Sequence, residues 1–518
     1  FMCSYAHMKK FTRIIDRKGK QYAYEITPYY DPETKNTKQK SKYLGVYENG
    51  KIVRKRSKIP KCVFDYGDLV PFLNIIKDMK LDALLKSELS DKHANTILAL
   101  ALNRVVKPVS ACNIQMWYEG TYLSKIYGDL PLSSQSLSDF MEALGESPIP
   151  RDFSQALIDN IGKGDPLLYD ITSLSSASKL MDILEYGYNR DGDALPQLNL
   201  SIIAHKDLGI PLCFDIRPGS VVDVSTLTNT TKMLQSYGLS RPTLVMDRGF
   251  FSETNLNDLI DKEFNFIMPA SFACKNVKSL VSKARRDIEN PNNLCKFGGD
   301  PIFVKPVVFN VGMGPVDGYV YYDMKREKEE KSEFYMRLHD VKERLNARKL
   351  RSWEKPSKVF ENITGNLSNY FSYKVSDNRL KANIKNKAVS QRVNRMGFTV
   401  ILYRGNYGWE EVLTWTRERD IIEKMFMALK RDIEVKPMRA HKTEVAKGWI
   451  FVAFVALIMR CRLSKMMVET GLIKKYSIPS LLLALSRVKQ VELSDGSMMM
   501  TEVPKKQRLI FEALGMQP

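Results

Sequence analysis

Three acidic residues, Asp170, Asp247 and Glu423, are the side chains whose surroundings favour metal chemistry. Asp170 lies inside the apolar segment Leu167-Leu-Tyr-Asp-Ile171, and Asp247 ends the apolar segment Thr243-Leu-Val-Met-Asp247. Burying an unpaired carboxylate in a strand is costly, so such a group is usually paired with a cation or bound to a metal ion. The alternative for each aspartate alone is a residue at a strand end that caps a loop.

Glu423 lies in a segment with the spacing of an amphipathic helix. At 100° per residue, Arg419, Glu423 and Lys430 share one stripe of that helix. A neighbouring apolar stripe consists of Ile422, Phe426, Leu429 and Ile433. The apolar stripe would pack on a sheet, so that Glu423 points to the sheet edge and Arg419 and Lys430 flank it toward a phosphate backbone. The alternative is an ordinary surface pair between Arg419 and Glu423, which contributes about 0.3 kcal/mol.

Histidine and cysteine give no sign of a zinc site. The five histidines form no H-E-x-x-H motif, and the seven cysteines form no C-x-x-C pair. Carboxylates are hard oxygen ligands, so the sequence favours Mg²⁺, with Mn²⁺ as a substitute. Scattered cysteines in odd number are typical of reduced thiols and not of a disulfide framework.

Composition and charge point to a folded protein with a polyanionic partner. The 518 residues are 44% hydrophobic and 27% charged, and Lys plus Arg exceed Asp plus Glu by 79 to 59, which gives a net charge of +20. Nucleic acid is the first candidate partner and a membrane surface the second, while the alternative is a merely basic protein. The longest apolar run, 449–459, is shorter than the roughly 20 residues of a membrane span. We expect no membrane association and a cytoplasmic, nucleoid-associated location.

The first 160 residues divide into two expected regions. Residues 1–64 form a basic β unit, since positions 1–60 hold 15 Lys/Arg against 5 Asp/Glu and a hairpin is expected over 45–53 with its turn at Asn49-Gly50. Residues 65–160 have helical apolar spacing, and a helix is expected over 136–144 with Ser136 as a possible cap. The β unit either contacts DNA or is a solvated cap. The helical region either binds DNA or serves in packing.

The middle of the chain predicts an α/β domain. Strands and helices alternate over 161–270 in the order β-β-β-α-β-α-β, with Asp223 and Ser252 as helix caps, which gives a mixed sheet with covering helices. Over residues 396–465 we expect a strand, a helix over 410–433 with a possible break, and an apolar helix, which belong to the same domain. An inserted β-rich and helical domain is expected over 271–395, and 466–518 form a C-terminal tail.

The ordered motifs resemble those of the DDE transposases of bacterial insertion sequences, of the IS-four superfamily. The family's third acid lies in a Y-(2)-R-(3)-E-(6)-K signature, which is Thr416-(2)-Arg419-(3)-Glu423-(6)-Lys430 here. Earlier motifs follow in the family's order: Tyr169-Asp170-Ile-Thr-Ser173, Gly187-Tyr-Asn-Arg-Asp191, Pro218-Gly-Ser-Val-Val-Asp223 and Val245-Met-Asp247-Arg-Gly249. The chain departs from the pattern at Thr416, where Tyr is usual, and at Ser220, where Asn is usual.

The resemblance implies a ribonuclease H-like catalytic core and a mechanism with two metal ions. Asp170, Asp247 and Glu423 would hold Mg²⁺, and Arg419 and Lys430 would bind the phosphates of the DNA ends. Asp247 and Glu423 are 176 positions apart, which the family's β-rich insertion would explain. The implied activity is cleavage at insertion-sequence ends followed by transfer of the 3′-OH to target DNA, by a homodimer in the DNA complex.

Two alternatives of different kinds remain open. The first is a catalytically inactive or repurposed transposase relative that binds DNA without cutting it. The second is a basic protein that binds RNA or a membrane surface and carries the acidic pattern by chance. No aromatic-rich RNA-binding motif and no basic amphipathic anchor in the sequence favours the second.

Overall fold

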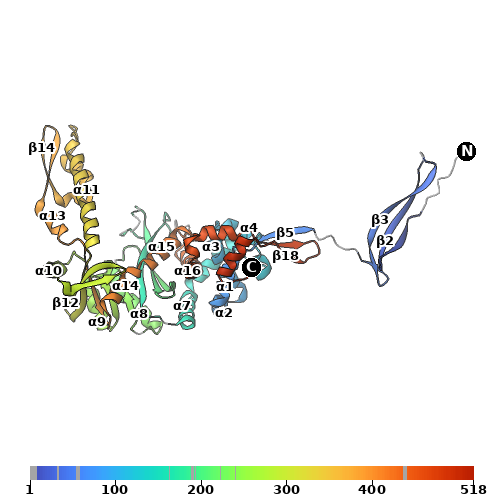
Figure 1. Ribbon diagram of the computed structural model, residues 1–518, viewed down its shortest axis with the longest axis horizontal. Helices are drawn as coiled ribbons and strands as arrows, with labels where there is room; N and C mark the ends of the chain where they lie inside the picture. Colours follow the sequence, from blue (N-terminus) through green and yellow to red (C-terminus); the bar gives the residue numbers. More distant parts are fainter. Residues whose placement is uncertain are drawn as a thin grey trace.

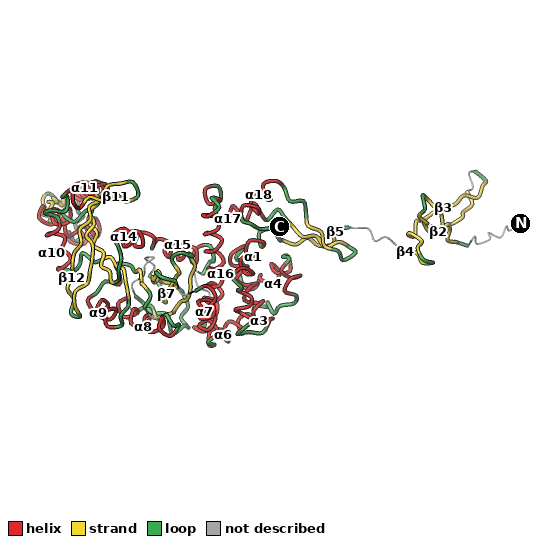
Figure 2. The backbone as a smooth tube through the Cα atoms, turned by 60° about the horizontal axis from the view of Figure 1, so that its bottom comes forward, coloured by secondary structure: helices red, strands yellow, loops and turns green. Residues whose placement is uncertain are grey.

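The chain folds into an elongated molecule with sheets at both ends and helices between them (Figure 1). The structure is a computed structural model that describes residues 9–31, 34–53, 59–162, 164–187, 189, 192, 194–221, 223–239, 241–435 and 440–518, with backbone only at 223–226. Figure 2 shows most of the helices grouped between the large sheet and a small sheet beside the C-terminus. The first four strands lie apart from both, at the N-terminal end of the molecule.

The N-terminal strands form an antiparallel sheet of their own. Its order is β1 (Phe11–Arg17), β2 (Lys20–Asp31), β3 (Asn36–Glu48) and β4 (Lys51–Val53). The expected hairpin joins β3 to β4, where Val46 pairs with Val53. Its turn residues Asn49 and Gly50 both have positive φ, at 51° and 79°, as the tight turn of a two-residue hairpin requires.

The last strand before the helical region pairs with the far end of the chain. β5 (Pro60–Asp65) is hydrogen-bonded to β17 (Lys489–Leu493), which also pairs with β18 (Met498–Met500). Lys489 forms an ion pair with Asp65 across this sheet. The C-terminal tail is therefore part of the same small sheet as the end of the first expected unit.

The helical region holds the helices α1 (Val70–Asp78), α2 (Leu81–Lys86), α3 (Asp91–Val106), α4 (Ile114–Glu119), α5 (Leu123–Tyr127), α6 (Ser134–Glu146) and α7 (Ile149–Ile161). Helix α6 begins two residues before the expected Ser136. Ser133 is its cap, because its hydroxyl oxygen accepts a hydrogen bond from the N–H of Ser136 at 3.2 Å.

A nine-stranded mixed sheet forms the other end of the molecule, in the order β11-β12-β13-β16-β10-β9-β6-β7-β8. The part of this sheet that comes first along the chain consists of β6 (Leu167–Ser175), β7 (Gln197–His205), β8 (Ile210–Pro218), β9 (Thr243–Val245) and β10 (Asn265–Pro269). The helices α8 (Asp223–Ser236) and α9 (Glu253–Asp261) lie between these strands in the sequence. The expected element order and mixed sheet are confirmed. Ser252 caps α9 by accepting from the N–H of Asn255 at 3.0 Å, whereas the side chain of Asp223 lies outside the described residues.

The range expected as an insertion contributes to two structures. Its first part extends the large sheet with β11 (Leu294–Phe297), β12 (Asp300–Val311) and β13 (Gly314–Tyr322), which reach β16 (Phe398–Arg404), while α10 (Lys275–Ala284) shares the apolar core of that sheet. The second part has a hydrophobic core of its own and projects from the sheet (Figure 1). It comprises α11 (Met324–Ala347), α12 (Pro356–Thr364), β14 (Phe371–Ser376), β15 (Arg379–Ile384) and α13 (Asn386–Val393).

A long buried helix joins the sheet to the helical region. After α14 (Trp409–Glu418) and α15 (Asp420–Arg431), the chain forms α16 (Thr443–Glu469), and the tail adds α17 (Ile478–Leu485) and α18 (Lys505–Ala513). Helix α16 packs against α6, α3, β8 and α15. Its apolar run is buried on all sides, as expected for a core helix. In the described parts of the chain no single helix meets the length and hydropathy of a membrane span, although α3 with residues 111–119 does so as a pair bent by 107°.

Two glycines allow α6 and α16 to cross closely. A Cβ atom at Gly448 would lie 2.2 Å from the carbonyl oxygen of Met141, and one at Gly145 would lie 1.9 Å from that of Glu444. Both obstacles are backbone atoms, so neither can move aside without separating the helices. This crossing fixes the helix against which α15 packs.

We predict that Gly448→Ala destabilises the protein by about 2 kcal/mol, because overpacking at a close contact forces the backbones apart. Urea denaturation of the full chain measures the effect. Gly120→Ala is the matched control, since its added Cβ would meet only atoms at 3.5 Å or more. Equal stability of the two variants would contradict the importance of the crossing.

Candidate active site

One guanidinium group brings the three acidic residues together. Arg419 Nη1 lies 3.0 Å from Asp170 Oδ2, and its Nη2 lies 3.5 Å from Asp247 Oδ1 and 2.5 Å from Glu423 Oε1. The three acids are far apart in sequence and come from the interior of β6, the residues after β9 and helix α15. They therefore surround a single cation beside two adjacent strands of the large sheet.

Asp170 is the most deeply placed of the three carboxylates. It lies within β6, whose residues are all buried and which continues to Ser175, so it is not a strand-end cap. Its side chain is 12% exposed. One carboxylate oxygen accepts a hydrogen bond from the N–H of Ile171 at 2.8 Å and the other faces Arg419. The backbone and one cation thus account for the burial of this charge.

Asp247 lies beside Asp170 because their strands run parallel. Leu168 of β6 pairs with Val245 of β9, so the aspartate two residues further on in each chain lies at the same level. Asp247 begins a short 3-10 helix, η2 (Arg248–Phe250), but its side chain makes no capping hydrogen bond there. The carboxylate is 45% exposed and faces Arg419, which favours the metal-site interpretation over the loop cap.

Glu423 reaches the same place from a helix. The expected break in the helix occurs at Arg419, between α14 and α15. The predicted apolar stripe of α15 is buried, which turns the opposite side, with Glu423 54% exposed, toward solvent. The surface pair between Arg419 and Glu423 does form. Since the same guanidinium also contacts two sheet aspartates and is 15% exposed, it is more than a surface pair.

Three consecutive residues fix the junction of α14 and α15 to three different parts of the molecule. Arg417 lies 3.8 Å from Asp323, Glu418 lies 3.1 Å from Lys206 at the end of β7, and Arg419 contacts the acids. Sequence patterns gave no signal for the first two pairs, because their partners are more than 90 positions away. They attach the end of α14, next to the acid cluster, to two distant parts of the chain.

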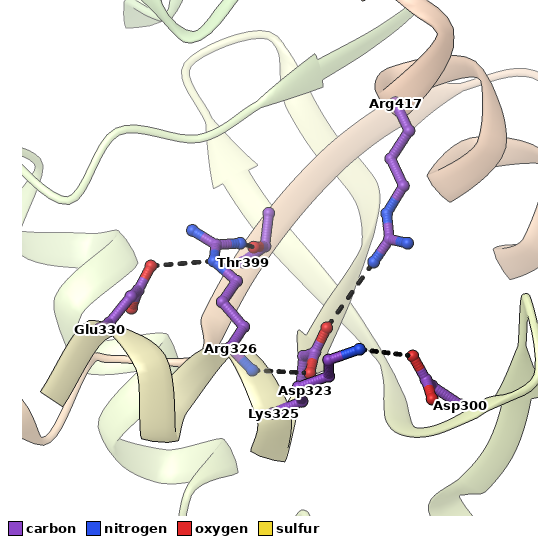
Figure 3. Close-up of polar contacts among 7 residues, drawn as sticks. All are labelled: Asp300, Asp323, Lys325, Arg326, Glu330, Thr399 and Arg417. Atoms are coloured by element: carbon purple, nitrogen blue, oxygen red, sulfur yellow. Dashed lines mark hydrogen bonds and ion pairs between the residues drawn. The ribbon is translucent and has the colours of Figure 1, made fainter. Parts of the chain in front are cut away.

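The contact of Arg417 leads into the projecting unit (Figure 3). Asp323 precedes α11 and caps it by accepting a hydrogen bond from the N–H of Arg326 at 3.0 Å. The Arg326 guanidinium in turn donates to Thr399 of β16 at 2.6 Å, and Lys325 lies 3.5 Å from Asp300 of β12. The base of α11 is therefore attached both to the sheet and to α14.

Comparison with known families identifies the domain that carries this site. Residues 164–459, more than half of the chain, match the family model described as "Transposase DDE domain". The chain belongs to this family of DDE transposases. The family range contains all three acids and both cationic residues predicted from the signature.

Two further comparisons give little information about this transposase. A cryo-EM structure of a piggyBac transposase synaptic complex with hairpin DNA is 9% identical, with 83% of this chain and 82% of that chain covered and a TM-score of 0.38. That similarity is too low to carry an argument about the present chain. No curated protein matches the present chain.

The two cationic residues of the signature lie in different settings. Arg419 is directed toward the acids, whereas the sequence predicted that it faces a phosphate backbone. Lys430 lies in the last turn of α15 and is partly buried. Thr416, which replaces the usual tyrosine, donates its hydroxyl hydrogen to the carbonyl oxygen of Val412 at 2.7 Å, so its hydroxyl is used within α14.

Residues of the middle motifs gather next to β6. Asn189 donates to Ser175 at the end of that strand at 2.9 Å, and the hydroxyl of Ser220 donates to Glu185. Asn199 donates to the carbonyl oxygen of Val221 at 3.0 Å. Of the predicted Gly187–Asp191 motif, residues 188, 190 and 191 lie outside the described residues, as does 222 in the second motif.

The donor set of the transposase site fits a hard divalent cation, and the guanidinium of Arg419 lies among its three carboxylates. Three carboxylates and waters are the ligands that Mg²⁺ prefers. Within the described ranges, no three His, Cys, Asp or Glu side chains are arranged to hold a metal ion as they stand. In the described structure the three carboxylates instead engage two nitrogens of one planar guanidinium.

We predict that, without metal, Asp170→Ala costs about 2 kcal/mol of unfolding free energy and Glu423→Ala about 0.5 kcal/mol or less. Removing Asp170 takes away the carboxylate at Nη1 on the buried side of the guanidinium, while Glu423, the exposed partner, is screened by water. Urea denaturation in EDTA measures both, with Asp420→Ala, an exposed acid on α15, as the control. A larger loss from Glu423→Ala would contradict the assigned burial.

Proposed function

We propose that this transposase cleaves DNA at the ends of an insertion sequence and transfers the freed 3′-OH to target DNA. Asp170, Asp247 and Glu423 are the catalytic residues and bind Mg²⁺, or Mn²⁺ in its place. The observation that carries the proposal is the meeting of these three acids on Arg419, inside the range that matches the DDE family. No other pattern in the sequence requires three such distant acids to share one place.

The chemistry follows from the charge of the substrate. A phosphodiester is anionic and repels nucleophiles, so catalysis requires positioning and charge neutralisation. Divalent ions held by Asp170, Asp247 and Glu423 would supply both when bound. Water attacks a phosphodiester at the element end and the P–O bond to the 3′ oxygen breaks, which releases a 3′-OH. That 3′-OH then attacks a phosphodiester of the target DNA. A new P–O bond joins the element to the target while the target's own P–O bond to its 3′ oxygen breaks, which leaves a 3′-OH on the target strand.

The protein contributes rigid placement of the carboxylates. Asp170 lies on β6 and Asp247 follows the end of the adjacent parallel strand β9 by two residues, while Glu423 closes the site from α15. Groups held on strands and helices keep their geometry better than groups on loops. The buried apolar stripe of α15 and the ion pairs of Arg417 and Glu418 hold the helix at this edge.

A ribonuclease H-like core is part of the proposal. Five neighbouring strands, β8-β7-β6-β9-β10, support it: the first three along the chain are antiparallel, and β9 and β10 are parallel to β6. The first acid lies on the central strand of this block and the second follows its parallel neighbour. That placement is what a two-aspartate site at one sheet edge requires.

DNA is the proposed partner, bound by a homodimer in the cytoplasm at the nucleoid. The net charge of +20 supports a polyanionic partner. The N-terminal 60 residues carry an excess of ten positive charges. The alternative is a transposase-derived protein that binds DNA without cutting it. The internal hydrogen bond of Thr416 favours that alternative at one point, because the hydroxyl does not extend toward DNA as a tyrosine would.

We predict that Asp170→Ala, Asp247→Ala and Glu423→Ala each abolish strand cleavage of element ends while leaving DNA binding largely intact. Cleavage by the unaltered chain should require Mg²⁺ or Mn²⁺ and stop on addition of EDTA. Asp420→Asn is the control, because Asp420 lies on the same helix but pairs with Lys424. Near-normal cleavage by any of the three alanine variants, or cleavage without metal, would reject the site.

We predict that Lys430→Ala weakens binding of element ends and reduces the slope of log affinity against log salt by about one unit, as expected for one lost phosphate contact. Fluorescence anisotropy across a salt series measures it. Lys424→Ala is the control on the same helix, since Lys424 is exposed and paired with Asp420. An unchanged slope would show that Lys430 does not contact phosphate.

A further inference from the structure

We propose that Arg419 is a positioning residue that holds the three carboxylates together until divalent ions replace it, and that the released guanidinium then binds a DNA phosphate. Metal binding and DNA binding would strengthen each other through this one side chain. The inference rests on the proposed function and adds a partner exchange to it. It also accounts for the difference between the predicted and the observed direction of Arg419.

The guanidinium and the ions compete for the same oxygens. Each of the three carboxylates presents an oxygen to Arg419 within 3.5 Å. A Mg²⁺ ion lies about 2.1 Å from its oxygen ligands. An ion bound to these oxygens would occupy the volume of the guanidinium and would also be repelled by its charge. Arg419 must therefore leave before the carboxylates can close on metal.

Position in the fold allows the side chain to leave while its backbone stays. Arg419 separates α14 from α15 and belongs to neither helix. Its neighbours Arg417 and Glu418 are held by Asp323 and Lys206, so the junction keeps its place. The contact with Asp170 is the buried side of the cluster. Asp247 and Glu423 are about half exposed and form its open side.

The exit side is also where the substrate must bind. If the carboxylates hold the reactive ions, the phosphate to be cleaved lies at the open side of the cluster. A guanidinium matches a phosphate with two parallel hydrogen bonds, as it matches a carboxylate. Arg419 can thus exchange one set of oxygens for the other. Because linkage is reciprocal, metal must then raise DNA affinity by the same factor by which DNA raises metal affinity.

The first test measures Mn²⁺ binding to the full chain without DNA, by calorimetry. Arg419→Gln should bind Mn²⁺ at least about tenfold more tightly, because both the competitor and its charge are removed. Arg419→Lys, which keeps the charge but cannot bridge three carboxylates, should lie between. Lys424→Gln is the matched control and should be unchanged, since Lys424 is exposed and pairs with Asp420 and not with the three acids. Equal or weaker binding by Arg419→Gln would overturn the proposal.

The second test measures the coupling. Affinity for an element end is determined by anisotropy with Ca²⁺ and with EDTA, so that binding is read without cleavage. Ca²⁺ should tighten DNA binding of the unaltered chain and of the control Lys424→Gln, and this effect should be reduced at least about threefold in Arg419→Gln. The same Ca²⁺ effect in Arg419→Gln would overturn the exchange. If Arg419→Gln fails to fold in EDTA, Arg419→Lys answers both tests, because it retains a cation among the acids.

Failure of the inference is distinguishable from failure of the proposed function. If Asp170→Asn loses Mn²⁺ binding while Arg419→Gln and Arg419→Lys behave as the unaltered chain, the metal site stands and the partner exchange is wrong. If Asp170→Asn, Asp247→Asn and the unaltered chain all bind Mn²⁺ equally, the acids are not the metal site and both proposals fall.

Discussion

Three negative charges held within reach of one positive group are the constraint on which this part of the structure depends. Carboxylates at such short range raise one another's free energy unless a cation lies between them. In the described structure that cation is Arg419, and its side chain reaches a strand, the residues after a strand and a helix at once. The parallel register of β6 and β9 and the break between α14 and α15 both serve this contact.

The surrounding architecture supports the helix junction from both sides. Behind it, α16 packs against α15 and is itself held by the close crossing with α6. In front, Arg417 and Glu418 attach the junction to the start of α11 and to the end of β7. The start of the projecting unit, at Asp323, is therefore in direct contact with Arg417 next to the acid cluster.

Local patterns in the sequence were sufficient to predict the helices and strands, but they were insufficient to predict which of these elements pair with one another. The period of the apolar residues predicted the stripe Ile422, Phe426 and Leu429, and the succession of strands and helices along the chain around Asp170 and Asp247, because periodicity depends on neighbours in the chain. The pairing of β5 with β17 has no local signature, since it joins positions more than 400 residues apart. The same holds for the attachment of β11–β13 to the large sheet.

The candidate site shows the same division. The order of the motifs indicated which acids belong together. It did not indicate that Arg419 would lie among them, because a helical stripe gives the direction of a side chain only relative to its own helix. The cap of α6 is a smaller example of the same limit. The cap is Ser133 and not Ser136, and the sequence does not distinguish them because several closely spaced serines could each cap the helix. Side-chain direction at the junction follows from tertiary contacts of Arg417 and Glu418, which no spacing encodes.

The most direct measurement is anomalous diffraction from crystals of the full chain grown with Mn²⁺. The account predicts an anomalous peak within coordinating distance of the carboxylate oxygens of Asp170 and Asp247, with Glu423 beside it and the Arg419 guanidinium turned away from all three. A peak elsewhere, or no peak with Arg419 still in contact with the three acids, would contradict the claim that these residues form one divalent metal site.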